Sequence, residues 1–160
     1  MILLVRIDER LIHGQVAVTW RGALGATVFA VVDDEIASAG WERDLVVSGV
    51  PDGTRGEVFA VGQAAELWES WLSDGERRLV LFACVASAVA LLEAGVRFDV
   101  LNVGGLHERP GRREFLPYVF LDEDEMALCR RLCGANVRLE ARNVPSAGAV
   151  EICRRLEVRE

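Results

Sequence analysis

The chain has 160 residues, a formal net charge of −7, 51% hydrophobic residues and 27% charged residues. This composition is typical of one globular domain, which we expect to span residues 1–160. The acidic balance argues against a nucleic-acid binder, which needs a basic face to replace counterions. The basic residues are all arginine, and the absence of lysine excludes a Schiff base, a lysine general base and a P-loop lysine.

Short apolar runs alternate with amphipathic segments along the chain. In chain order, the expected strands cover residues 2–6, 27–32, 56–61, 79–83, 98–103, 118–121 and 137–141, the last at a sheet edge. The expected helices cover residues 14–24, 34–47, 63–72, 88–94 and 122–133, with a final short helix after Ser146. In the third of these helices we expect Leu67, Trp68 and Trp71 to face inward. This alternation predicts a parallel sheet with helices on both faces.

Several expected helices begin at a residue that can accept a hydrogen bond from the first turn. Asp33 and Asp34 stand before the second helix, and Ser87 stands before the fourth. Asp122 precedes Glu125 at the spacing of a capping box. The pair Asp33-Asp34 also resembles a metal-binding pair, but we favour the helix-cap interpretation.

Ligands of parallel α/β proteins bind beyond the carboxyl ends of the strands, which makes the segments after the strands candidate walls of a site. On this ground we place at the rim of the site Asp33, Asp34, Ser87, Gly104, Gly105 and His107. An alternative for His107 is a solvated position in its polar loop. The loop arginines Arg109, Arg112 and Arg113 fit a solvated turn and a docking patch for an acidic partner equally well.

The richest chemistry follows the first strand. His13 precedes Gly14, where a helix is expected to start and to offer unpaired backbone N–H groups to an anion. Arg10 and Arg6 can add charge-assisted hydrogen bonds to that anion. Asp8 can accept a proton from one imidazole nitrogen and leave the other nitrogen as a nucleophile. The catalytic residues that we expect are therefore His13, Arg10 and Asp8.

A histidine nucleophile beside anion-binding groups favours phosphoryl transfer, because arginine and backbone donors stabilise charge on the phosphoryl oxygens. The phosphate-binding residues that we expect are Gly14, Arg6 and Gln15. There is no Walker lysine and no clear Mg²⁺-binding acid cluster, so direct use of ATP is not expected and the donor would be another phosphoprotein. We expect no metal and no cofactor.

The four cysteines form no Cys-x-x-Cys pair, and we expect small apolar roles rather than a metal or redox site for Cys84, Cys129, Cys133 and Cys153. The first apolar run is too short for a signal peptide and lacks a basic region before it. No apolar stretch approaches the length of about 20 residues that a membrane span needs. We therefore expect a cytoplasmic protein without direct membrane insertion.

Three stretches carry a family resemblance. The segment Arg-Ile-Asp-Glu-Arg-Leu-Ile-His-Gly-Gln-Val over 6–16 closely resembles the start of the IIB component of the mannose/fructose/sorbose family of the bacterial phosphoenolpyruvate-dependent sugar phosphotransferase system (PTS). The resemblance continues through Val-Asp-Asp-Glu-Ile-Ala over 32–37 and Leu-Asn-Val-Gly-Gly-Leu over 101–106. The first motif is specific, whereas the other two are weak by themselves.

The resemblance implies a three-layer α/β/α fold with a mainly parallel sheet of about six or seven strands. It also implies a protein-N(pi)-phosphohistidine–sugar phosphotransferase in which His13 takes a phosphoryl group from phosphorylated IIA. The group then passes to a sugar imported by the membrane components IIC and IID, which would hold the protein at the inner membrane. Arg10 and Asp8 match the family's arginine and acid.

Two other functions remain open at this point. In the first, phosphorylation of His13 gates a partner without sugar transport, since a phosphate adds about −1.5 to −2 charge. In the second, the chain is a nucleotide- or small-acid-binding enzyme. The second is weakened by the lack of Gly-x-Gly-x-x-Gly after the first strand.

Overall fold

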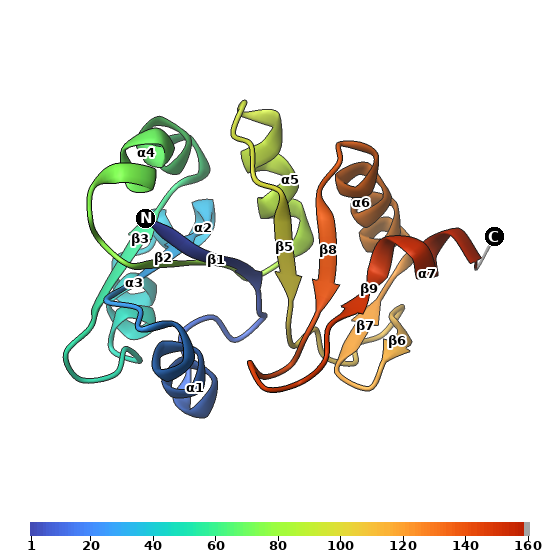
Figure 1. The fold of residues 1–160 in the computed structure, drawn as a ribbon, viewed down its shortest axis with the longest axis horizontal. Coiled ribbons are helices and arrows are strands. Elements are labelled where there is room, and N and C mark those ends of the chain that lie inside the picture. Colours follow the sequence, from blue (N-terminus) through green and yellow to red (C-terminus); the bar gives the residue numbers. More distant parts are fainter. Residues whose placement is uncertain (159–160) are drawn as a thin grey trace.

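The computed structural model describes residues 1–158, apart from the side chains of residues 15, 16 and 158, and shows a sheet covered by helices on both faces (Figure 1). The strands are β1 (Ile2–Ile7), β2 (Val28–Val32), β3 (Arg55–Phe59), β4 (Arg78–Phe82), β5 (Val100–Val103), β6 (Arg113–Leu116), β7 (Val119–Leu121), β8 (Arg138–Ala141) and β9 (Val150–Glu151). The helices are α1 (Gly14–Leu24), α2 (Asp34–Ser38), α3 (Gly40–Val47), α4 (Val61–Ser73), α5 (Val85–Glu93), α6 (Glu123–Gly134) and α7 (Ile152–Val158).

The main sheet has seven strands in the order β3-β2-β4-β1-β5-β8-β9. Every pairing in it is parallel except that of β8 with β9. The expected fold class is therefore confirmed. The segment 137–141 was expected at a sheet edge, and this is wrong because β9 pairs with its outer side. β9 is only two residues long, too short to show a pattern in the sequence.

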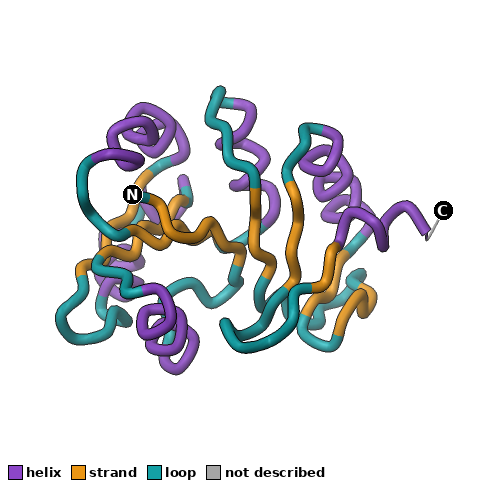
Figure 2. The backbone as a smooth tube through the Cα atoms, viewed as in Figure 1, coloured by secondary structure: helices purple, strands orange, loops and turns teal. Residues whose placement is uncertain are grey.

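A separate antiparallel hairpin, β6–β7, lies beyond the main sheet. The sequence predicts its second strand but places Arg113 and Glu114, the first residues of β6, in a polar loop. Figure 2 shows the hairpin beside the loops that follow β5 and β8, at the lower edge of that view. The hairpin therefore borders the same edge of the sheet as the first loop.

The strands bury both faces, and their alternation assigns side chains to two cores. In β2, Phe29 and Val31 belong to the core cluster that includes residues of α1 to α3, whereas Ala30 and Val32 belong to the cluster that includes residues of α4 to α7. This period of two follows from the geometry of a strand, in which successive side chains point to opposite faces. The result is three layers, with the sheet in the middle.

Two helix boundaries and one side-chain orientation differ from expectation. The helix expected over 34–47 is two helices, because Ala39 has an extended conformation between them. Ser87 is no cap, since α5 already begins at Val85. Leu67 is 39% exposed, so its expected inward position is wrong, while its neighbour Trp68 is buried. The buried side of α4 is formed by Val61, Ala64, Trp68 and Trp71, and Leu67 lies outside it.

Other local expectations are confirmed. Asp122 accepts a hydrogen bond from the Glu125 backbone N–H at 2.7 Å, and the capping box is complete. Gly25 ends α1 in a left-handed conformation with φ of 66°. Cys129 is buried like a small apolar residue. The same expectation is wrong for Cys133 and Cys153, which form a disulfide.

Candidate phosphoryl-transfer site

The first loop connects β1 to α1 and is fixed to both neighbouring strands. The Asp8 backbone N–H donates to the Phe82 carbonyl at 2.9 Å, at the end of β4. The Glu9 backbone N–H donates to the Gly105 carbonyl at 3.0 Å, just after β5. The loop therefore stands at the carboxyl edge of the sheet, where α/β proteins bind ligands.

A buried ion pair between Arg6 and Asp8 anchors this loop to the interior of the protein. Arg6 and Asp8 are each 1% exposed, and the Arg6 Nη2 donates to the Asp8 Oδ2 at 2.9 Å. Arg6 also donates to the Asn102 side chain and to the carbonyls of Arg142 and Asn143, the last two at 2.8 and 3.3 Å. Burial lowers the pKa of the Arg6 guanidinium, while the Asp8 carboxylate acts in the opposite direction.

This geometry corrects the role expected for Arg6. Its guanidinium lies 5.0 Å from the centre of the Trp20 ring and has partners at both η nitrogens. A side chain in this position holds Asp8 and the following loop rather than an external phosphate. The sequence motif identified the residue but not the side to which it points.

His13 stands at the N-cap position of α1, and its side chain is 21% exposed. Its Nδ1 lies 3.1 Å from the Leu11 carbonyl oxygen and 4.0 Å from the Asp8 Oδ1. The Leu11 carbonyl, and not the Asp8 carboxylate as expected, therefore makes the hydrogen bond. Because a carbonyl only accepts, the ring proton in this contact resides on Nδ1. The Nε2 atom is buried without a hydrogen-bond partner among the described residues.

Leu11 is placed for this contact by an unusual backbone. Its φ is 54°, in the left-handed region that residues with a Cβ rarely adopt. Its N–H donates to the Asp8 carbonyl at 2.9 Å, and its side chain is 6% exposed. The tight turn from Asp8 to Leu11 aims the Leu11 carbonyl at His13. No pattern in the sequence reveals this turn.

The start of α1 is open. Gly14 has a φ of 27°, and a Cβ added there would meet nothing within 4 Å. The first turn has no acidic residue, and His13 makes no side-chain cap. Among the described residues no side chain caps this first turn, so its N–H groups and the positive end of the helix can receive an anion. The expected role of the Gln15 side chain lies outside the described residues.

Arg10 is the cation that remains available at this site. Its backbone N–H donates to the Asp8 Oδ1 at 3.3 Å, which ties it to the buried pair. Its side chain is exposed, and within the described residues no ion pair engages it. An exposed guanidinium two residues after Asp8 fits the anion-holding role that the sequence predicts.

The rim beyond β5 is an ionic cluster around Glu9, which is 10% exposed at its side chain. His107 contacts Glu9 through its backbone N–H and its ring Nδ1, both at 2.9 Å. Arg112 pairs with Glu9 at 2.9 Å and also with Glu125, and Arg109 pairs with Glu9 as well. Arg112 is thus neither solvated nor free for docking, whereas Arg113 pairs with Glu123 at the surface.

This cluster also sets the protonation of Glu9. Burial alone would raise the pKa of Glu9, but the hydrogen bonds from His107 and Arg112 outweigh it. The pKa of Glu9 therefore lies below its ordinary value. The carboxylate stays charged and fastens the loop after β5 to the first loop.

Two glycines let the end of β5 come close to this arrangement. A Cβ on Gly104 would lie 2.1 Å from the Arg6 Nη2. A Cβ on Gly105 would lie 3.3 Å from the His107 Cε1 and 3.7 Å from the Asp8 Oδ1. Both glycines therefore lie directly against Arg6, Asp8 and His107, and their place at the rim of a site stays a prediction.

The other expected rim residues serve the scaffold. The Asp33 Oδ1 accepts from the Ile36 N–H at 2.9 Å and caps α2, whereas the Asp34 Oδ1 accepts from the Val61 N–H at 2.8 Å. The helix-cap interpretation is thus confirmed, with the second cap on a different helix from the one expected. Ser87 has Cys84 as its neighbour, with 3.4 Å between the Oγ and the Sγ.

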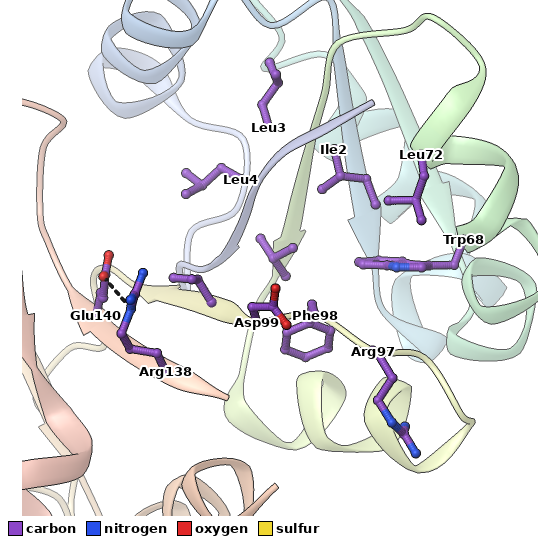
Figure 3. A pocket seen from close by; sticks show the side chains of 12 residues that line it. Ile2, Leu3, Leu4, Trp68, Leu72, Arg97, Phe98, Asp99, Arg138 and Glu140 are labelled. Atoms are coloured by element: carbon purple, nitrogen blue, oxygen red, sulfur yellow. Dashed lines mark ion pairs between the residues drawn. The ribbon is translucent and has the colours of Figure 1, made fainter. Parts of the chain in front are cut away.

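A pocket of about 500 Å³ lies at the opposite, amino-terminal edge of the sheet (Figure 3). It opens because β1 and β5 pair only near their carboxyl ends, through Arg6 with Asn102 and Ile7 with Val103. Trp68, Phe98 and the paired Arg138 and Glu140 line it. None of the residues proposed for phosphoryl transfer lines it, so it plays no part in that chemistry.

Sequence reasoning missed the partners that hold the site together. One of them left a signal, since Asn102 is the single polar side chain inside an otherwise apolar strand. The carbonyls of Leu11, Arg142 and Asn143 left none, because every residue has a carbonyl.

Together, the fold and the site define a doubly wound α/β protein with a histidine at the open start of its first helix and an available arginine beside it. Comparison with known proteins specifies the family. The family model described as "PTS system sorbose subfamily IIB component" matches residues 2–160, and the chain belongs to this family. IIB components are phosphotransferases of the sugar phosphotransferase system, which agrees with the chemistry that the site suggests.

Individual relatives agree with this assignment. The fructose-specific EIIB component of Bacillus subtilis is 32% identical over 91% of this chain and 89% of its own length. The mannose-specific EIIAB component of Escherichia coli is 33% identical over 88% of this chain, which spans 44% of that longer protein. The crystal structure of the IIBSor domain of the sorbose permease from Klebsiella pneumoniae has a TM-score of 0.89 at 28% identity, covering 100% of this chain and 98% of the other. In the described part of this chain, no helix has the length and hydropathy needed to cross a bilayer.

Proposed function

We propose that His13 is the residue that carries phosphate, accepting it from phosphorylated IIA and passing it to a sugar imported by the IIC and IID components. The observation that carries the proposal is the position of His13 at the open N-terminus of α1, next to the exposed Arg10. In this proposal the protein works in the cytoplasm, at the inner membrane through IIC and IID. The A and B parts joined in the name of the E. coli relative support IIA as the donor.

The groups at the site take distinct roles in this reaction. A ring nitrogen of His13 attacks phosphorus, and the bond between phosphorus and the donor breaks. The N–H groups at the start of α1 and the Arg10 guanidinium stabilise the charge on the phosphoryl oxygens. Asp8 positions the Arg10 backbone, and Arg6 holds Asp8.

The ring of His13 turns during this step. Nδ1 is held by the Leu11 carbonyl and Nε2 is buried, so neither nitrogen presents a free lone pair to a partner in this orientation. Phosphorylation at Nδ1 breaks the contact with Leu11, whereas phosphorylation at Nε2 requires that atom to become exposed. A ³¹P NMR spectrum of the phosphorylated protein distinguishes the two isomers.

The test is a reconstituted phosphorylation assay. The protein is mixed with labelled phosphoenolpyruvate, enzyme I, the histidine carrier protein and a cognate IIA. We expect an acid-labile, base-stable adduct that disappears in His13→Ala and persists in His107→Ala, the variant of the other histidine. Label that survives in His13→Ala contradicts the assignment.

The role of Arg10 has its own variant. A charge-assisted hydrogen bond contributes roughly 1.5–3 kcal/mol, so Arg10→Ala should slow phosphorylation roughly 10- to 100-fold. The exposed position of Arg10 predicts an unchanged far-UV circular dichroism spectrum and thermal midpoint. A wild-type rate in this variant removes Arg10 from the reaction.

A further inference from the structure

The disulfide between Cys133 and Cys153 joins the end of α6 to the beginning of α7. The two Cα atoms are 5.8 Å apart, and the cysteines are separated by 20 positions in the sequence. The segment enclosed by this bond contains β8, the loop over 142–149 and β9. The bond therefore closes the last part of the fold into a loop.

Among the described residues, a short strand pairing and the start of α7 hold β9 to the sheet besides the disulfide. Its pairing with β8 consists of Glu140 opposite Glu151 and Ala141 opposite Val150. The helix that follows contributes two buried anchors, Ile152 and Leu156. A two-residue antiparallel pair is weak by itself, so the covalent bond carries much of the attachment of this segment.

The enclosed segment also reaches the phosphoryl-transfer site. The Arg142 and Asn143 carbonyls, in the loop between β8 and β9, accept hydrogen bonds from Arg6 at 2.8 and 3.3 Å. Arg6 in turn holds Asp8, on which the first loop is built. A chain of direct contacts thus runs from the disulfide-closed segment to the loop that carries His13.

The disulfide is accessible to a small thiol. Cys133 and Cys153 are both partly exposed and line a surface pocket of about 330 Å³, together with Arg130 and Leu156. Cys129 lies one helical turn before Cys133, but its burial raises the pKa of its thiol to about 12. A thiol that stays protonated is a poor nucleophile, so exchange at this bond depends on a thiol from outside the protein.

We propose that the Cys133–Cys153 bond is a redox-sensitive clasp that controls how firmly the β8–β9 loop holds Arg6 beneath the His13 loop. Two equivalents of a low-molecular-weight thiol reduce the bond, giving two protein thiols and one small-molecule disulfide. The reverse reaction with that small-molecule disulfide closes the clasp again. This regulation rests on the proposed function for its effect on phosphoryl transfer.

In the cytoplasm, the location proposed above, the bond would be exposed to changes in the thiol redox state. Thiol pools keep most cytoplasmic cysteines reduced, and disulfides that form there are usually catalytic or redox-sensing rather than permanent staples. The clasp would be open under ordinary conditions and closed under oxidising ones. A protein with a closed clasp then holds Arg6 and Asp8 more rigidly.

The first experiment follows the clasp without using any activity. The protein is equilibrated with oxidised or reduced dithiothreitol, and its free thiols are alkylated after denaturation and counted by mass spectrometry. We expect two alkylated cysteines in the oxidised form and four in the reduced form, with a thermal midpoint on the order of 5–10 °C lower after reduction. Four alkylated cysteines in both forms, or equal midpoints, overturn the clasp.

The same samples test whether the disulfide affects the hydrogen bonds of Arg6. Exchange of the Arg6 guanidinium protons, followed by NMR, should be faster in the reduced form because its carbonyl acceptors loosen. The variant Cys133→Ser/Cys153→Ser is the control, and it should behave like the reduced protein in both mixtures. Identical Arg6 exchange in the two wild-type forms overturns the link to the site.

The last measurement tests the effect on phosphoryl transfer. The initial rate of His13 phosphorylation should fall roughly 2- to 30-fold on reduction, the range of energetic coupling between linked sites. Rates that are measurable but equal contradict the proposed regulation. A protein that accepts no phosphate in either form contradicts the proposed function instead, while the thiol count and Arg6 exchange still decide the clasp.

Discussion

At Gly104 we expect even the methyl group of alanine to clash with a neighbouring side chain. A Cβ at this residue would lie 2.1 Å from the Nη2 and 2.3 Å from the Cζ of Arg6. Such contacts are far inside van der Waals separation, so Gly104→Ala forces Arg6 or the end of β5 to move. Arg6 has no room to move, because it is 1% exposed and hydrogen-bonded at both η nitrogens.

The free energy of unfolding should fall by about 3 kcal/mol in Gly104→Ala. Overpacking a close-packed region costs about 1–3 kcal/mol when the backbone absorbs the clash. Displacing Arg6 instead breaks the buried pair with Asp8, which costs about 3–5 kcal/mol. Because Arg6 is buried and hydrogen-bonded at both η nitrogens, the clash is severe and the loss lies at the upper end of the first range, where the two ranges meet. For a chain of this size the thermal midpoint should drop by roughly 6–12 °C.

Urea unfolding followed by circular dichroism measures this loss, with Gly22→Ala as the matched control. Gly22 lies in α1, and a Cβ added there would meet nothing within 4 Å. That replacement should stabilise the protein by roughly 0.5–1 kcal/mol, since alanine favours a helix interior. A loss below about 1 kcal/mol in Gly104→Ala, well under the clash estimate, would refute the reasoning.

Two further predictions concern the ionic cluster and a helix cap. Because the folded-state pKa of Glu9 lies below its ordinary value, the charged form contributes stability that is present at neutral pH and lost as the pH falls through the lowered pKa. Thermal midpoints measured from neutral to acidic pH should therefore fall less steeply in Glu9→Gln than in the wild type, and parallel curves would contradict this. Asp34→Ala removes the acceptor of the Val61 N–H and should lower the free energy of unfolding by about 1 kcal/mol, measured by urea unfolding. Asp34→Asn keeps an acceptor oxygen and should therefore retain most of the wild-type stability. Equal stability of Asp34→Ala and the wild type would exclude the cap.

The sequence predicted those parts of the fold that depend on neighbouring residues. Gly25 ends α1, and Asp122 with Glu125 starts α6, because capping involves residues three or four positions apart. The His13 motif was recognisable because Asp8, Arg10 and His13 lie within six consecutive residues.

Distant contacts escaped prediction. The partner of Arg6 on β5 is 96 positions away, and the carbonyl of Asn143 is 137 positions away. Glu9 meets Arg112 across 103 positions, so this ion pair leaves no local signal in the sequence. No local pattern encodes such pairs, and one sequence cannot show which polar residues the fold brings together.

The left-handed turn at Leu11 has a consequence for how the histidine is oriented. A carboxylate that held the ring would release it on protonation, and the orientation would then vary with pH. The Leu11 carbonyl does not titrate, so its hydrogen bond with Nδ1 needs no charged partner. The chain accepts an uncommon backbone conformation at one residue, and the carbonyl that this turn aims at His13 holds the resting ring without itself gaining or losing a proton.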